Sequence, residues 1–176
     1  GAAADPRVLG YVSLASGVLR GGGTSTSTSS AATSTTTPLP AKPSFFIGGS
    51  VDNVVPVAAV TKPSFDAAPS PSRLWVIDGV GHNGFDDFCT FGNGTGIIGI
   101  AQASGLGPLL DAQPQLKKLG QDGCLPPALK VDETFPIIRH AVIAWLRALF
   151  GIDAQAVGLD ASAAGAYVTP VTVSSK

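Results

Sequence analysis

The sequence has few charged residues and no concentration of charge of one sign. Only 13% of its 176 residues are Asp, Glu, Lys or Arg, and the formal net charge is −1. Because nucleic acids and anionic lipids attract basic patches, this composition argues against both as partners. No apolar run reaches the about 18 to 20 residues of a membrane-spanning helix, and no basic segment followed by an apolar one opens the chain. We therefore expect no transmembrane segment, and we expect any export signal to be removed or to lie outside this sequence.

Cysteine is also scarce, with two residues in the chain, Cys89 and Cys124. An even count without a C-x-x-C spacing fits a single disulfide better than a zinc site or a redox motif. A disulfide would imply an oxidising compartment, whereas two buried free thiols would suit a cytosolic protein. We expect the disulfide.

The apolar content is high enough for a folded core. Hydrophobic residues make up 44% of the chain, and 176 residues suit one domain or the larger part of one. Residues 24–37 are Thr, Ser and Ala only, and such a tract cannot bury enough apolar surface to offset its ordering entropy. We predict one domain over 1–176, interrupted by a flexible Ser/Thr-rich loop at about 21–40.

Two short apolar runs end in glycines and are followed by polar residues suited to acid–base chemistry. The run 44–47 precedes a glycine pair and Asp52, and the run 74–77 precedes a glycine cluster and His82. Both runs are typical of buried strands, and 57–72 between them suits a crossover with a short helix. Parallel strands joined in this way place both loops at one edge of the sheet. There a carboxylate can accept the imidazole Nδ1 proton and leave Nε2 to act as a base.

The remaining segments complete an α/β pattern. Residues 8–14 predict a further strand, and residues 96–119 a helix with a partly apolar loop near the mouth of the site. The clearest helix is expected over 134–150, with a proline in its first turn and a glycine just past its end. The small-residue tail from 152 onward closes with β-prone residues at 167–169 and 171–173, and it is expected to run as a tether across the surface.

Several of these motifs together resemble a known family. The segments 48–56 (GGSVDNVVP) and 79–89 (GVGHNGFDDFC), followed by QDGC and a helix at 136–151, are similar to the C-terminal half of bacterial secreted α/β-hydrolases. The nearest are dienelactone hydrolase-like esterases and chlorophyllase or platelet-activating-factor acetylhydrolase-like esterases, which border on the polyester hydrolases.

The resemblance implies both a fold and a set of site residues. The fold is the C-terminal part of an α/β-hydrolase, with a mostly parallel sheet, flanking helices and the N-terminal strands missing. Asp52 is then the acid and His82 the base of a Ser-His-Asp triad. The resemblance also favours the Cys89–Cys124 disulfide and a secreted or periplasmic location. The implied activity is hydrolysis of a small-molecule, lipid or polymer carboxylic ester without a cofactor.

The chain departs from that family at the nucleophile. The family carries its serine in a G-x-S-x-G elbow upstream of the acid and the histidine, and this sequence has no such motif. Residues 1–8 resemble the end of the helix that follows the elbow, so the serine is expected before Gly1, on a missing N-terminal segment or a companion chain. Ser13 and Ser16 lack an elbow context. This chain alone is expected to be inactive.

Two other functions stay open at this point. The first is a non-catalytic binding or assembly protein that uses an α/β-hydrolase-like fold, because a fold does not determine a function. The second is a metal-dependent hydrolase with His82, Asp86 and Asp87 as ligands, although these acids also suit caps of a following helix. His140 lies off the apolar stripe of its helix and is expected to be a surface or hydrogen-bonded histidine.

Overall fold

The computed structural model describes residues 5–17, 39 and 41–176. Most of the expected flexible loop at 21–40 lies outside the described residues, as does the first half of the expected helix end at 1–8.

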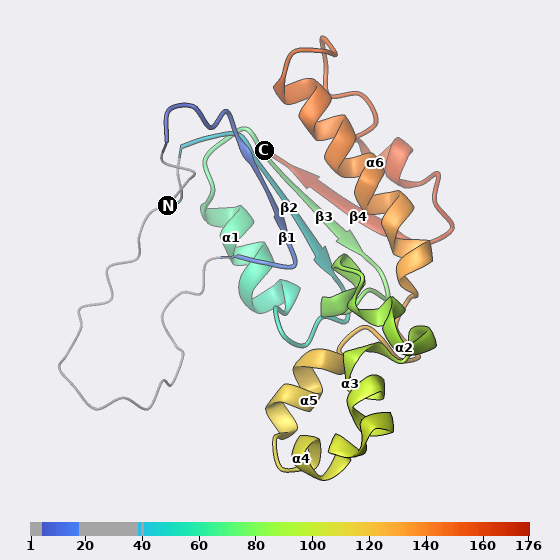
Figure 1. Ribbon diagram of the computed structural model, residues 1–176. Helices are drawn as coiled ribbons and strands as arrows, with labels where there is room; N and C mark the ends of the chain where they lie inside the picture. Colours follow the sequence, from blue (N-terminus) through green and yellow to red (C-terminus); the bar gives the residue numbers. More distant parts are fainter. Residues whose placement is uncertain (1–4, 18–38, 40) are drawn as a thin grey trace, which may run out of the picture.

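The described chain is built on one sheet with the strand order β1-β2-β3-β4 (Figure 1). The first three strands are parallel neighbours, and the last is antiparallel to β3. Their bounds are β1 Tyr11–Leu14, β2 Ser44–Gly49, β3 Ser72–Ile77 and β4 Val171–Ser175. The expected α/β class, with a mostly parallel sheet and flanking helices, is therefore confirmed.

Helices cover the two faces of this sheet, and the alternation along β2 shows which residues face which helix. Phe45 belongs to a buried cluster with residues of the long helix α6 (Val131–Leu149). Phe46 packs instead with Phe65 of α1 (Lys62–Ala67). Because successive side chains of a strand point to opposite faces, α6 and α1 lie on opposite sides of the sheet, as the ribbon shows (Figure 1).

The crossover from β2 to β3 is short, as expected. The π-helical turn η2 (Val57–Thr61) runs directly into α1. A short connection of this kind brings the carboxyl ends of β2 and β3 to one edge, where the candidate site lies.

The long helix begins three residues earlier than predicted, so Pro136 lies in its second turn rather than its first. Proline removes one intrahelical hydrogen bond, here to the carbonyl of Asp132. Asp132 and Pro136 are both exposed, so water can satisfy that carbonyl. The buried face of α6 includes Ala141 and Trp145, which belong to the predicted apolar stripe.

The tail was expected to form a surface tether, and this expectation is wrong for its last residues. Val171–Ser175 forms β4, and the main-chain groups of Ser72 and Lys176 exchange hydrogen bonds at its end. Val171 and Val173 pack against the core cluster on the α6 side. The β-branched residues therefore complete an edge of the sheet. A short helix, α7 (Ala161–Ala164), precedes them.

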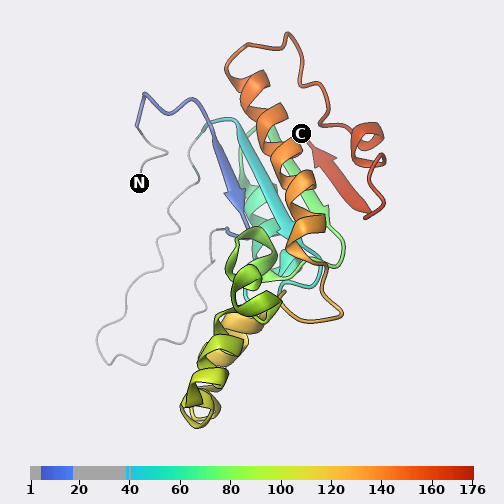
Figure 2. The ribbon, with the colours of Figure 1, turned by 45° about the vertical axis from the view of Figure 1, so that its right-hand side comes forward.

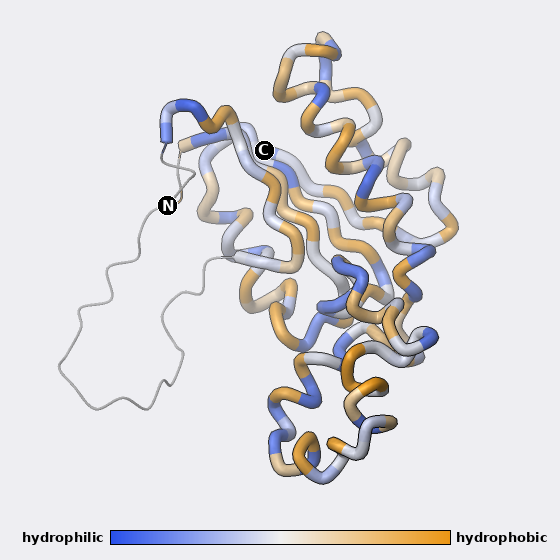
Figure 3. The backbone as a smooth tube through the Cα atoms, viewed as in Figure 1, coloured by the Kyte–Doolittle hydropathy of each residue, from blue (hydrophilic) through white to orange (hydrophobic). Residues whose placement is uncertain are grey.

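Residues 91–121 form a helical arm that extends away from the carboxyl edge of the sheet (Figure 2). Its pieces are α2 Phe91–Gly94, α3 Gly96–Ala101, η5 Gln102–Leu106, α4 Gly107–Asp111 and α5 Pro114–Gln121. Ile98 and Leu110 are buried in it, whereas Leu106 and Leu109 are exposed. Figure 3 shows hydrophobic residues along much of this arm.

Candidate active site

The ends of β2 and β3 are held against each other by a close backbone approach. A Cβ atom on Gly49 would overlap the carbonyl group of Val80, so only glycine fits there. Ser50 bridges the two ends, because its Oγ donates to Asp78 Oδ1 at 2.8 Å and accepts from the Gly79 N–H at 2.9 Å. The loops that follow these strands therefore start from a shared and rigid base.

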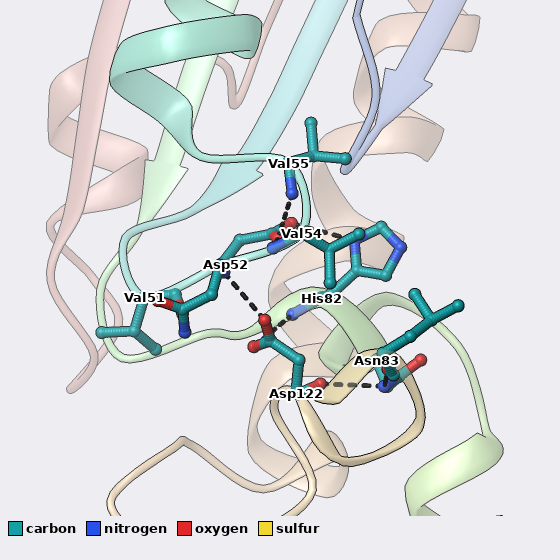
Figure 4. A network of polar contacts seen from close by, with 9 residues as sticks. Val51, Asp52, Val54, Val55, His82, Asn83 and Asp122 are labelled. Carbon is teal, nitrogen blue, oxygen red and sulfur yellow. Dashed lines mark hydrogen bonds and ion pairs between the residues drawn. The ribbon is translucent and has the colours of Figure 1, made fainter. Parts of the chain in front are cut away.

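Asp52 lies in the loop after β2 (the acid loop), and its side chain is fully buried. Its Oδ1 accepts hydrogen bonds from the N–H groups of Val54 and Val55, at 2.9 and 2.6 Å. Its Oδ2 lies 3.1 Å from Nδ1 of His82 (Figure 4). Both carboxylate oxygens are thus engaged, and the backbone bonds aim one of them at the imidazole.

His82 opens the short 3₁₀ helix η3 (His82–Phe85) in the loop after β3 (the histidine loop), and its side chain is 23% exposed. An ionised carboxylate is only an acceptor, so Asp52 selects the tautomer in which Nδ1 carries the proton. Nε2 then keeps its lone pair, and no residue in the described ranges hydrogen-bonds it. The arrangement can act as a general base.

Two residues that the sequence analysis did not single out tie the site to the arm. Asp122 follows α5, and its Oδ2 accepts from the Asn53 N–H at 2.8 Å while Oδ1 lies 3.4 Å from the His82 N–H. Asn83 donates through Nδ2 to the carbonyls of Leu119 and Asp122, at 2.7 and 3.0 Å. The residues that these side chains join across the arm are 36 to 40 positions apart in the sequence, so no local pattern could have identified the contacts.

The expected disulfide between Cys89 and Cys124 is confirmed, with the two Sγ atoms 2.08 Å apart. Cys89 belongs to the 3₁₀ turn η4 (Phe88–Thr90), which follows the histidine loop. Cys124 comes two residues after Asp122. The bond therefore fixes the base of the arm beside the histidine loop.

The structure does not bring the other candidates to this site. Ser13 and Ser16 line a surface hollow beside β1, and neither hydroxyl is hydrogen-bonded to His82 in the described part of the chain. Asp86 accepts from the Phe88 N–H at 2.9 Å, and burial raises the pKa of its carboxyl. Asp87 is the N-cap residue of the following 3₁₀ turn, but its side chain makes no capping hydrogen bond.

A metal centre of His82, Asp86 and Asp87 has no support in the geometry. Within residues 5–17, 39 and 41–176, no three His, Cys, Asp or Glu side chains are grouped so that they could hold a metal ion. His140 is part-buried, its Nδ1 is hydrogen-bonded to the Tyr167 hydroxyl, and it contacts Trp75 edge-on, as expected of a structural histidine. Burial raises the pKa of Tyr167.

A hollow of about 520 Å³ lies between the acid loop and the arm. Its walls include Val51 and Asn53 on one side, and Lys118 and Leu125 on the other. Asp122 also lines it, whereas His82 does not. The acid loop therefore adjoins a surface that offers both apolar and cationic groups.

Comparison with protein-family models and with curated proteins finds no match for this chain. Among the described residues, no helix has both the length and the apolar character needed to cross a membrane.

Proposed function

We propose that this chain supplies the acid and the base of a Ser-His-Asp triad in a carboxylic ester hydrolase of the α/β-hydrolase type. The observation that carries the proposal is the contact of 3.1 Å between Asp52 Oδ2 and His82 Nδ1. The opposite oxygen of Asp52 is held by two backbone N–H groups, so the carboxylate cannot turn away from the ring. This is the orientation that a triad acid gives to its histidine.

In the proposed reaction His82 acts twice. It takes the proton of a serine hydroxyl as the serine attacks the ester carbonyl, and then it gives that proton to the leaving alcohol. Water repeats the sequence on the acyl-enzyme. Asp52 stabilises the imidazolium in each half-reaction and stays ionised.

The serine is proposed to lie on a segment or companion chain that precedes Gly1 in the complete enzyme. Within the described part of the chain, β1 pairs with β2 alone, so its other edge can accept a strand. A parallel strand added there would end at the carboxyl edge, where His82 lies. A sharp turn after that strand would then present a serine toward Nε2.

The substrate class is proposed from the surroundings of this edge. The hollow beside the acid loop includes Val51 and Leu125, so apolar ester groups have a surface to contact there. Small, lipid and polymer esters all fit this description. A secreted or periplasmic location is supported by the Cys89–Cys124 disulfide, because such bonds persist in oxidising compartments.

A fluorophosphonate probe tests this proposal on the protein isolated together with any chain that accompanies it. Intact mass spectrometry under denaturing conditions would show which polypeptide carries the label. We expect a labelled serine on the companion or preceding segment, and we expect His82→Ala to abolish the labelling. His140→Ala is the matched control and should label at the wild-type rate.

Two results would overturn the proposal. One is the absence of any labelled serine in the isolated material, which would make the binding or assembly function the leading proposal. The other is labelling that His82→Ala leaves unchanged.

A further inference from the structure

Asp122 is a buried carboxylate that the proposed reaction does not use. It is 8% exposed, and no salt bridge joins it to a cation in the described ranges. Removing a carboxylate from water is unfavourable unless hydrogen bonds compensate it. The contacts that this side chain makes should therefore indicate its role.

Those contacts are main-chain N–H groups from two different loops. One oxygen accepts from the Asn53 N–H, next to Asp52 in the chain, at 2.8 Å. The other lies 3.4 Å from the N–H of His82 itself. A single carboxylate therefore spans the acid loop and the histidine loop (Figure 4).

The position of Asp122 is itself fixed from several sides. Its carbonyl accepts from the Asn83 N–H at 2.8 Å and from Asn83 Nδ2 at 3.0 Å. The disulfide begins two residues later, at Cys124. The backbones of Gly81 and Gly123 touch, because a Cβ on Gly81 would lie 2.5 Å from the Gly123 Cα and 2.7 Å from Asp122 Oδ1.

We propose that Asp122 is a positioning residue that holds Asp52 and His82 in register through the backbones of their two loops. It touches neither the imidazole ring nor the reacting atoms. It acts by fixing the main-chain positions of Asn53 and His82, and through them the positions of the Asp52 and His82 side chains. This role rests on the proposed function for its catalytic consequence, whereas its geometric consequence can be measured on this chain alone.

The geometric test uses NMR of the imidazole nitrogens and the Nδ1 proton of His82 in the folded chain. Wild type should show the tautomer with the proton on Nδ1 and a downfield Nδ1–H resonance. In Asp122→Asn the amide can accept from one loop only, so we expect the Nδ1–H resonance to broaden or disappear and the tautomers to mix. Asp111→Asn removes an exposed carboxylate of the same arm and should leave the His82 signals unchanged.

A second variant provides the same test if Asp122→Asn does not fold. Gly81→Ala places a Cβ 2.5 to 2.7 Å from the Gly123 backbone and from the Asp122 carboxylate, so it displaces this junction without changing its charge and should alter the His82 signals in the same direction. A dispersed amide spectrum establishes that each variant is folded. Wild-type His82 signals in folded Asp122→Asn would overturn the positioning role.

The catalytic test uses the complete enzyme and the rate of fluorophosphonate labelling. A misplacement of about 1 Å can lower a rate about 100-fold, so Asp122→Asn should label about 10- to 100-fold more slowly while KM for an ester changes little. Asp111→Asn should match wild type. If His82→Ala abolishes labelling but Asp122→Asn equals Asp111→Asn, the role of Asp122 is refuted and the proposed function survives. If His82→Ala has no effect, the proposed function itself fails.

Discussion

Replacing Asn83 by Asp keeps the shape of the side chain and changes one NH₂ group into an oxygen. Asn83 is 3% exposed, and its Nδ2 donates to the carbonyl oxygens of Leu119 and Asp122 at 2.7 and 3.0 Å. An ionised carboxylate has no proton to donate, so an oxygen would face two carbonyl oxygens at these distances. The substitution therefore turns two attractive contacts into repulsive ones.

The size of the effect follows from these contacts. Each lost hydrogen bond is worth about 0.5 to 1.5 kcal/mol, and an uncompensated buried charge adds to this loss. We expect Asn83→Asp to lower the free energy of unfolding by about 3 to 5 kcal/mol at pH 7. The burial also raises the pKa of the introduced carboxyl in the folded state, so the folded variant binds the proton more tightly than the unfolded one. Its deficit should therefore shrink as pH falls toward that pKa.

Urea unfolding of wild type and variant at pH 7 and at about pH 4.5 measures the loss of stability and its pH dependence. The loss is obtained from the shift in the urea midpoint, provided that the dependence of the unfolding free energy on urea concentration is the same for both proteins. Asn93→Asp is the matched control, because Asn93 is exposed and followed by glycine as Asn83 is. The control should change the free energy of unfolding by less than about 0.5 kcal/mol. A deficit below about 1 kcal/mol for Asn83→Asp at pH 7, or one that does not depend on pH, would refute the hydrogen-bond assignment at the base of the arm.

Three further perturbations test other parts of the same region. Replacing Cys89 and Cys124 together by serine opens a loop whose ends are 35 residues apart, and urea unfolding should show a loss of about 3 to 4 kcal/mol, or no loss if the bond does not form. Asp86→Asn should be neutral or slightly stabilising at pH 7, because burial raises the pKa of Asp86 and penalises its ionised form; thermal unfolding should show this gain vanish as pH falls, and a gain that grows instead would contradict the burial argument. Gly49→Ala forces a Cβ against the Val80 carbonyl and should cost about 1 to 3 kcal/mol or more in urea unfolding, whereas a neutral result would mean that β2 and β3 can separate at little cost.

The sequence was sufficient to predict the parts of the molecule that depend on local patterns. The apolar runs that end in glycines became the parallel strands β2 and β3. The parallel pairing then placed Asp52 and His82 at one edge, within hydrogen-bonding distance. The period of the apolar residues likewise indicated the long helix, and the cysteine count indicated the disulfide. These features depend on residues near in sequence or on a general rule of sheet topology.

Two features of the edges and surface required the tertiary structure. The tail residues Val171–Ser175 form β4 because the free edge of β3 offers hydrogen-bonding partners. The β-prone residues of the tail favour an extended chain, but they do not show whether that chain joins the sheet. The exposure of Leu106 and Leu109 was equally out of reach, because an apolar residue on a helix can face either a core or solvent. In both cases the outcome depends on whether another segment of the folded chain packs or pairs there, and the local sequence does not contain that information.

The roles of Asp122 and Asn83 show the same limit at the site itself. By itself, the sequence predicted that Asp52 and His82 meet, because the loops that follow consecutive parallel strands lie at one edge of the sheet. It did not determine what holds them there, because the side chains of Asn83 and Asp122 bind backbone groups that lie far away in the sequence. Every residue possesses such backbone groups, so side-chain patterns do not show which of them a polar side chain will bind. Only the folding of the arm against the sheet edge selected these two residues.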